Sequence, residues 1–190
     1  REVEIGKPYA MVITTNGGLW RYKIGDTVMF TSTNPYRLCI TGRTKQYINT
    51  FGEEVMVDNT DKAIELTSKA LRATVSDYTV APVHMTLNGR GGHHWLVEFD
   101  QAPESFTDFA ELLDKNLQQL NSDYEAKRFL GMALDPLKLT VLPKGTFRKW
   151  LQKKGKSGSQ AKVPRLSNER VYLEEVLEMI SHPLTQQKTV

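Results

Sequence analysis

The chain has 190 residues, of which 39% are hydrophobic and 25% are charged, and its formal net charge is +3. This length suffices for one complete domain, or for one domain with a smaller subdomain, and the composition is that of an ordinary globular protein. No apolar stretch approaches the roughly 18 residues that a membrane span requires, so the sequence excludes a transmembrane protein.

The start of the chain and its cysteine and histidine content give expectations about context. The sequence begins at Arg1 with neither a signal peptide nor an initiator Met, so we expect a piece of a longer protein. The single Cys39 lies in a strand-like stretch, which predicts a small buried side chain in a reducing, cytoplasmic compartment. His93 and His94 are adjacent, but Glu98 lies too far along the same strand to share a metal with them, so no metal site is predicted.

Four short stretches near the start alternate apolar and polar residues with the period of a half-buried strand. Turn-forming residues separate these stretches, so we expect a small antiparallel sheet or partial barrel. Its edge would be covered by whatever precedes Arg1. The expected strands are 9–15, 19–24, 27–32 and 36–41.

The turn expected between the second and third strands carries a carboxylate, Asp26, directly after Gly25. A carboxylate held at the end of a strand can accept hydrogen bonds from two vicinal hydroxyl groups, such as those of a ribose. The alternative interpretation is turn chemistry alone, because acidic residues are common in turns that bind nothing.

The sequence around Asp26 resembles a known motif. The run YKIGD at 22–26 resembles the Tyr-Arg-x-Gly-Asp motif of adenylate-forming enzymes, the superfamily of luciferases, acyl-CoA synthetases and phenylacetate ligases. The longer run 14–26 resembles the auxin-responsive acyl acid–amido synthetase family, and its bacterial members most closely. The resemblance implies that Asp26 binds the ribose of ATP and of the acyl-adenylate, with Tyr22 also at the nucleotide. Lys23 replaces the usual arginine, and the two differ where a planar cation is needed.

The next run, 42–54, resembles the hinge motif of the same superfamily, Gly-Arg-x-Asp/Lys followed by a hairpin with a fixed glycine. The resemblance implies that the chain crosses here from a large domain to a small C-terminal lid, which rotates between two catalytic half-reactions. It places Lys45 at the hinge and Arg43 near the nucleotide. Without the resemblance, the run could be a hairpin with an exposed charged turn. The occurrence of two motifs in order and at close spacing favours the functional interpretation.

After the hinge, the pattern alternates between the period of helices and that of strands. We expect a first helix capped by Asp58 and a second that opens with a capping box of Ser105 and Asp108. Asn121 and Tyr124 also match the family, and we interpret them as packing residues. The order β-α-β-β-α-β predicts a small α+β lid with helices on one face of a sheet. The expected helices are 59–72 and 106–120, and the expected strands are 74–87, 93–99 and 137–142.

The C-terminal part of the chain is basic. Residues 136–167 contain nine Lys or Arg and no acid, so the rest of the chain carries −6, the difference between +3 and +9. We expect a short amphipathic helix over 145–154, a flexible linker over 156–160 and a last helix near the C-terminus. The runs GTF and QAKVPR, the latter at 160–165, resemble the family motifs Gly-Thr-Phe and Gln-Tyr-Lys-x-Pro-Arg.

By this resemblance, Lys162 is the candidate catalytic residue. The lids of the superfamily carry a lysine that binds the α-phosphate and the acyl carboxylate during adenylation. Such a cation is needed because the reaction joins two anions, and positioned positive charge stabilises the transition state. The alternative is that Lys162 and the neighbouring lysines form only a solvated surface. Ala161 departs from the motif, which has a larger residue at this position.

Together these features predict an α+β fold, with a small antiparallel β subdomain over 1–42, a hinge over 43–54 and a C-terminal lid domain over 55–190. The resemblance implies the C-terminal part of an acyl acid–amido synthetase that uses ATP and Mg²⁺. Such an enzyme converts a carboxylic acid to an acyl-adenylate and joins it to an amino acid, with release of AMP. No Ser/Thr/Gly-rich phosphate loop is present, so we expect this piece to be inactive without the N-terminal domain.

Two alternative functions are considered. A thioester ligase of the same superfamily, which uses coenzyme A, would share the ribose and hinge motifs. The basic run 136–167 could instead bind a polyanion, with Phe147 and Trp150 as stacking groups. Nucleic acid is the less favoured partner, because the sequence contains no recognised nucleic-acid-binding motif.

Overall fold

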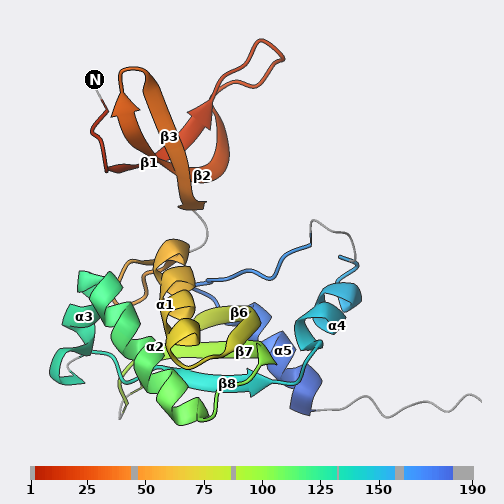
Figure 1. The fold of residues 1–190 in the computed structure, drawn as a ribbon. Coiled ribbons are helices and arrows are strands. Elements are labelled where there is room, and N and C mark those ends of the chain that lie inside the picture. Colours follow the sequence, from red (N-terminus) through yellow and green to blue (C-terminus); the bar gives the residue numbers. More distant parts are fainter. Residues whose placement is uncertain (1–2, 44–46, 87–88, 132, 157–160, 182–190) are drawn as a thin grey trace, which may run out of the picture.

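The computed structural model describes residues 3–43, 47–86, 89–131, 133–156 and 161–181 (Figure 1). The first part forms a three-stranded sheet in the order β1-β2-β3, in which neighbouring strands are antiparallel. In Figure 1 this sheet stands apart from the body that the remaining elements form. Its strands are β1 (Pro8–Ile13), β2 (Tyr22–Thr33) and β3 (Tyr36–Arg43).

β2 is one continuous strand, whereas the sequence predicted two strands separated by a turn. Gly25 takes a φ of +88°, which is accessible to glycine at little cost. The register of β2 against β1 shifts between Ala10 and Val12 of β1, so a β-bulge takes up the extra residues and pairing resumes beyond it. Asp26 therefore lies within a strand, next to a bulge, and the prediction of a turn is wrong.

The second body is built on a three-stranded sheet in the order β6-β7-β8. β6 and β7 are antiparallel, and β8 joins β7 in parallel. The strands are β6 (Thr74–Val83), β7 (Gly92–Gln101) and β8 (Lys138–Leu142). The helices are α1 (Val57–Ala70), α2 (Phe106–Leu120), α3 (Ser122–Arg128), α4 (Thr146–Lys153) and α5 (Val171–Ser181), with a 3-10 turn at Phe129–Gly131. None of the described helices is long and apolar enough to cross a membrane.

The two faces of this sheet have separate hydrophobic cores. Successive residues of a strand point to opposite faces, so neighbours in β6 and β7 contribute to different cores. Val80 and Trp95 belong to the core under α1 and α2, whereas Ala81 and Leu96 belong to the core under α4 and α5. The α+β fold is confirmed, but the prediction of helices on one face is wrong, because both faces of β6 and β7 are apolar and each needs a cover.

The expected helix starts are partly correct. The cap at Ser105 is confirmed, because its hydroxyl accepts a hydrogen bond from the backbone N–H of Asp108 at 3.1 Å. Asp58 does not cap α1 but lies in its first turn, and the residue before the helix, Met56, donates its N–H to the side-chain oxygen of Asn59 at 2.9 Å. The expected short basic helix is present as α4. The expected linker falls mostly on 157–160, outside the described residues.

A short hairpin opens the second body. Its strands β4 (Tyr47–Ile48) and β5 (Val55–Met56) are antiparallel. The side chains of Ile48 and Val55 are completely buried in the core under α1 and α2. The hairpin 47–56 is therefore packed into the second body, although the predicted hinge extends to residue 54.

Candidate functional site

The structure brings two of the predicted nucleotide-binding residues together. Asp26 of β2 is the cross-strand partner of Arg43 of β3. Asp26 is half-buried, and the following residue, Thr27, is buried and accepts a hydrogen bond from the hydroxyl of Thr41 at 3.2 Å. Tyr22 begins the same strand and is 51% exposed. The bulge and the pairing with β3 thus fix a carboxylate at an accessible point of the first sheet.

The other two predicted site residues, Lys45 and Lys162, do not lie in the described part of the first sheet. Lys45 belongs to residues 44–46, which are outside the described residues. Lys162 lies in the second body, in the stretch 161–168 that precedes α5, and its side chain is exposed. We call this stretch the lysine segment. The predicted nucleotide-binding and catalytic residues are therefore on separate bodies.

The lysine segment is hydrogen-bonded to β6. The N–H of Val80 donates to the carbonyl of Arg165 at 2.8 Å, and the carbonyl of Val80 accepts from the N–H of Ser167 at 3.1 Å. The hydroxyl of Thr79 adds a bond of 2.7 Å to the carbonyl just before Arg165. The chain is therefore held in place from two residues after Lys162 onward.

Arg165 adds a charged anchor to the lysine segment. Its guanidinium lies over the ring of Tyr78, 4.4 Å from the ring centre, and forms an ion pair with Asp77. It also lies 3.9 Å from Asp61. Burial raises the pKa of Asp77 despite the attraction of Arg165. A planar guanidinium can stack and pair at once, which the compact ammonium group of a lysine does poorly.

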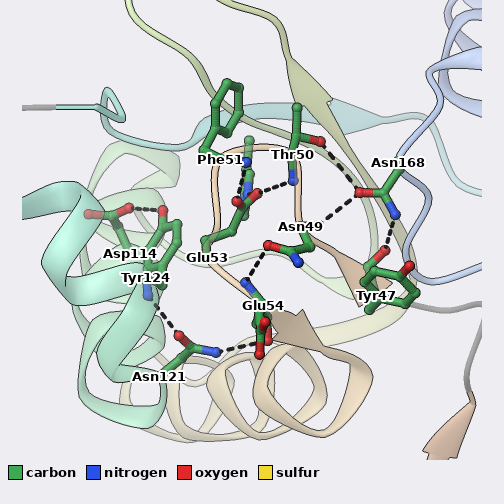
Figure 2. A network of polar contacts seen from close by, with 11 residues as sticks. Tyr47, Asn49, Thr50, Phe51, Glu53, Glu54, Asp114, Asn121, Tyr124 and Asn168 are labelled. Carbon is green, nitrogen blue, oxygen red and sulfur yellow. Dashed lines mark hydrogen bonds and ion pairs between the residues drawn. The ribbon is translucent and has the colours of Figure 1, made fainter.

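The loop between β4 and β5, residues 49–54, is held by polar contacts on three sides (Figure 2). On the first side, the fully buried carboxylate of Glu53 accepts the N–H of Phe51 at 2.6 Å and that of Thr50 at 3.4 Å, and it lies 3.0 Å from Nε2 of His93. Burial raises the pKa of Glu53, but the hydrogen bonds from His93 and from backbone N–H groups outweigh it, so the pKa is lowered. These contacts fasten the loop to β7.

Asn168 holds the second side of the loop. Its amide nitrogen donates to the carbonyl of Tyr47 at 3.0 Å, and its amide oxygen accepts the N–H of Asn49 at 2.8 Å. The hydroxyl of Thr50 donates to the same oxygen at 3.4 Å. Because Asn168 belongs to the lysine segment, these bonds connect that segment to the hairpin 47–56.

Asn121 holds the third side of the loop and caps α3. Its amide nitrogen donates to the carbonyl of Glu54 at 3.2 Å, and its oxygen accepts the N–H of Tyr124 at 2.7 Å. The hydroxyl of the fully buried Tyr124 donates to Asp114 at 2.6 Å. The interpretation as a packing residue is confirmed for Tyr124, whereas Asn121 makes polar contacts to the loop and to α3.

The two adjacent histidines have different partners. Whereas His93 contacts the buried Glu53, His94 lies 2.9 Å from the hydroxyl of Thr140 and 3.4 Å from Arg170. Burial and the charges of Lys138 and Arg170 lower the pKa of His94 to about 4. In the described part of the chain, no group of three or more His, Cys, Asp or Glu side chains is placed to hold a metal ion.

The stacking groups of the polyanion hypothesis are not accessible. Phe147 and Trp150 of α4 are only 2% and 4% exposed and pack in the core between α4 and α5. The indole N–H of Trp150 donates to Glu175 of α5 at 2.9 Å. Neither ring can stack on a nucleobase in this arrangement, so that part of the hypothesis is wrong.

Comparisons with known proteins place both bodies in one family. Residues 1–43 match the model of the GH3 family central domain, and residues 58–171 match that of the GH3 family C-terminal domain. A jasmonoyl–L-amino acid synthetase, GH3.5, of Oryza sativa subsp. japonica is 32% identical, over 97% of this chain and 32% of its own length. An indole-3-acetic acid-amido synthetase, GH3.4, of Arabidopsis thaliana is 30% identical, over 86% of this chain and 29% of its own length.

The fold has a relative among solved structures. It is similar to that of the GH3.15 acyl acid amido synthetase, with a TM-score of 0.75 and 24% identity over 93% of this chain and 34% of that chain. This likeness supports the fold alone. In all of these comparisons, the chain spans about a third of the length of the proteins it matches.

Proposed function

This chain belongs to the GH3 family, and we propose that it is the C-terminal part of an ATP-dependent acyl acid–amido synthetase. The enzyme converts a carboxylic acid to an acyl-adenylate, and the amine of an amino acid then displaces AMP to form an amide. The observation that carries the proposal is the pairing of Asp26 with Arg43, at the end of the part that matches the central-domain model. The names of the relatives, which are amido synthetases, favour an amino acid over coenzyme A as the acceptor.

In the proposed reaction, Asp26 accepts hydrogen bonds from the two ribose hydroxyls of ATP. A carboxylate suits this task because it is an acceptor with two oxygens, and hydrogen bonds to a charged group are stronger than those between neutral groups. Its place next to the Gly25 bulge, within a strand paired on both sides, limits its movement. Arg43 and Tyr22 are the other residues that we propose near the nucleotide.

Lys162 supplies the cation for the adenylation step. A carboxylate oxygen of the acid attacks the α-phosphorus of ATP, and the bond from that phosphorus to the pyrophosphate oxygen breaks. The ammonium group of Lys162 reduces the repulsion between the two anions as they approach. Its side chain is exposed and precedes the anchored Arg165 by three residues, so its ammonium group is open to a ligand.

Magnesium is part of the proposal, because a divalent cation neutralises the charge of the departing pyrophosphate. Since the described residues offer no cluster that fits a metal, we assign no residue of this chain to it.

We also propose a reducing, cytoplasmic location for a bacterial enzyme. The single Cys39, which has a free thiol and is half-buried rather than buried as expected, is what supports a reducing location.

The test is carboxylate-dependent ATP–pyrophosphate exchange by the full-length protein that contains this chain, across a panel of acids that includes jasmonic and indole-3-acetic acids. We expect Asp26→Ala to lower kcat/KM for ATP about 100-fold, which corresponds to about 2.7 kcal/mol. Thr33→Ala, on the exposed far end of the same strand, is the control and should retain activity. Absence of exchange with every acid would contradict the proposal. Acid-dependent AMP formation by the 190-residue chain alone would contradict only the prediction that this part is inactive without the N-terminal domain.

A further inference from the structure

We propose that Asn168 is a positioning residue that couples the hairpin 47–56 to the lysine segment and so fixes Lys162 relative to the hinge region. This inference rests on the proposed function, because it concerns how Lys162 is delivered to the reacting phosphate. It is drawn from the bonds of Asn168 to Tyr47 and Asn49, which we call the amide clamp.

The amide clamp replaces a strand at the edge of the hairpin. The carbonyl of Tyr47 in β4 and the N–H of Asn49, just after β4, are two residues apart and point to the same side, because both are bonded to Asn168. A neighbouring strand would offer these groups one donor and one acceptor. The planar side-chain amide of Asn168 offers both, at 3.0 and 2.8 Å. Both ends of the amide are therefore used in holding the hairpin.

The path from the amide clamp back to Lys162 is short and held along its length. Ser167 and Arg165 are bonded to the backbone of Val80, and Leu166 between them is 1% exposed. A shift of the hairpin therefore reaches Lys162 through the five residues 163–167, of which 164–167 are bonded to β6 or buried and have little freedom to absorb it. In the other direction, only residues 44–46 separate the hairpin from β3.

The hairpin has attachments of its own that do not depend on the amide clamp. Ile48 and Val55 are completely buried, and Glu53 is bonded to β7 through His93. Loss of Asn168 should therefore leave the hairpin attached to the second body and loosen mainly its connection to the lysine segment. This separates a positioning role from a general contribution to folding.

A second asparagine provides a matched control. Asn121 also donates its amide to the hairpin, at the carbonyl of Glu54, but it comes from the junction of α2 and α3. It has the same side chain and a similar bond length, and it does not belong to the lysine segment. If coupling runs through Asn168, the same substitution at the two positions will have different effects on the reaction.

The experiment compares Asn168→Ala and Asn121→Ala in the full-length protein by ATP–pyrophosphate exchange and by hydrogen exchange of the peptide 47–54. We expect faster hydrogen exchange of this peptide in both variants. For Asn168→Ala, kcat should fall about tenfold, equivalent to about 1.4 kcal/mol in the barrier, with KM for ATP changed less than twofold. For Asn121→Ala, kcat should stay within twofold of wild type.

Two results would overturn the inference: an unchanged kcat in Asn168→Ala despite faster hydrogen exchange, or equal losses of kcat in both variants. If Asn168→Ala fails to fold, Asn168→Asp keeps the shape and the acceptor but replaces the donor to Tyr47 with a charged oxygen that the Tyr47 carbonyl repels. We expect it to lose at least threefold in kcat, and an unchanged kcat would equally refute the coupling. A wild-type protein without exchange activity would instead refute the proposed function.

Discussion

Replacing Glu53 by alanine should markedly destabilise the second body. The carboxylate is completely buried and is hydrogen-bonded to the N–H of Phe51, the N–H of Thr50 and Nε2 of His93. Its removal leaves the buried ring of His93 and two partly buried backbone N–H groups without this partner, and an unpaired buried group costs about 1–3 kcal/mol. A hydrogen bond to a charged group contributes about 1.5–3 kcal/mol, so the loss of several such bonds costs a few kcal/mol. We therefore expect the free energy of unfolding to fall by about 3–5 kcal/mol.

The measurement is urea unfolding of the 190-residue chain, followed by circular dichroism. Glu54→Ala is the matched control, because Glu54 is the adjacent residue with an exposed side chain and bonds to Asn49 and Asn121 only through its backbone. That variant should change the free energy by less than about 0.5 kcal/mol. A loss below about 1 kcal/mol for Glu53→Ala would show that the carboxylate does not anchor the loop, and would refute the reasoning.

The contribution of Glu53 should also depend on pH. Because its pKa is lower in the folded chain than the ordinary value of 4.5, the folded state binds a proton less readily than the unfolded state. The stabilisation is therefore fully present above the ordinary value and is lost as the pH falls through the folded value. The difference in stability between wild type and Glu53→Gln should accordingly shrink as the pH is lowered below about 4.5. A difference that grows on acidification would contradict the direction of the shift.

Two further predictions concern the surroundings of this loop and of Lys162. A Cβ on Gly91 would lie 2.3 Å from the ring of Phe51, so Gly91→Ala should displace the ring and lower the free energy of unfolding by about 1–3 kcal/mol in the same assay. Arg165→Lys should lower kcat for ATP–pyrophosphate exchange several-fold, because a lysine cannot both stack on Tyr78 and pair with Asp77. Retained stability after Gly91→Ala, or wild-type exchange by Arg165→Lys, would contradict these expectations.

The elements of the fold were predictable where one local period dominates the sequence. The cap at Ser105 and the helix that follows it are examples, because the apolar residues of α2 recur at helical spacing. The bulge was not predictable, since Gly25 inside a strand and a glycine in a turn give the same local signal. The second covered face was missed because the residues of β7 on that face include His94 and Glu98, which are polar in sequence, and His93 on the other face is polar too. In the structure each of them is buried against a polar partner.

The candidate site was predictable only where a motif marks it. Asp26 and Arg43 each belong to a motif, but their pairing depends on the register of β2 and β3, which local spacing does not determine. Asn168 has no comparable signal. Its partners Tyr47 and Asn49 lie 121 and 119 residues earlier in the chain, and a single asparagine has no period that could reveal them.

The bonds between the lysine segment and β6 have a consequence for association between molecules. β6 is at one end of its sheet, and the backbone N–H and carbonyl of Val80 would otherwise be open to a strand of another chain. Arg165 and Ser167 occupy both groups. If the lysine segment dissociated from β6 to bring Lys162 to a ligand, the unpaired backbone groups of β6 would be exposed to other chains each time. If Lys162 acts as proposed, movement of the whole second body with the lysine segment in place would keep this edge covered.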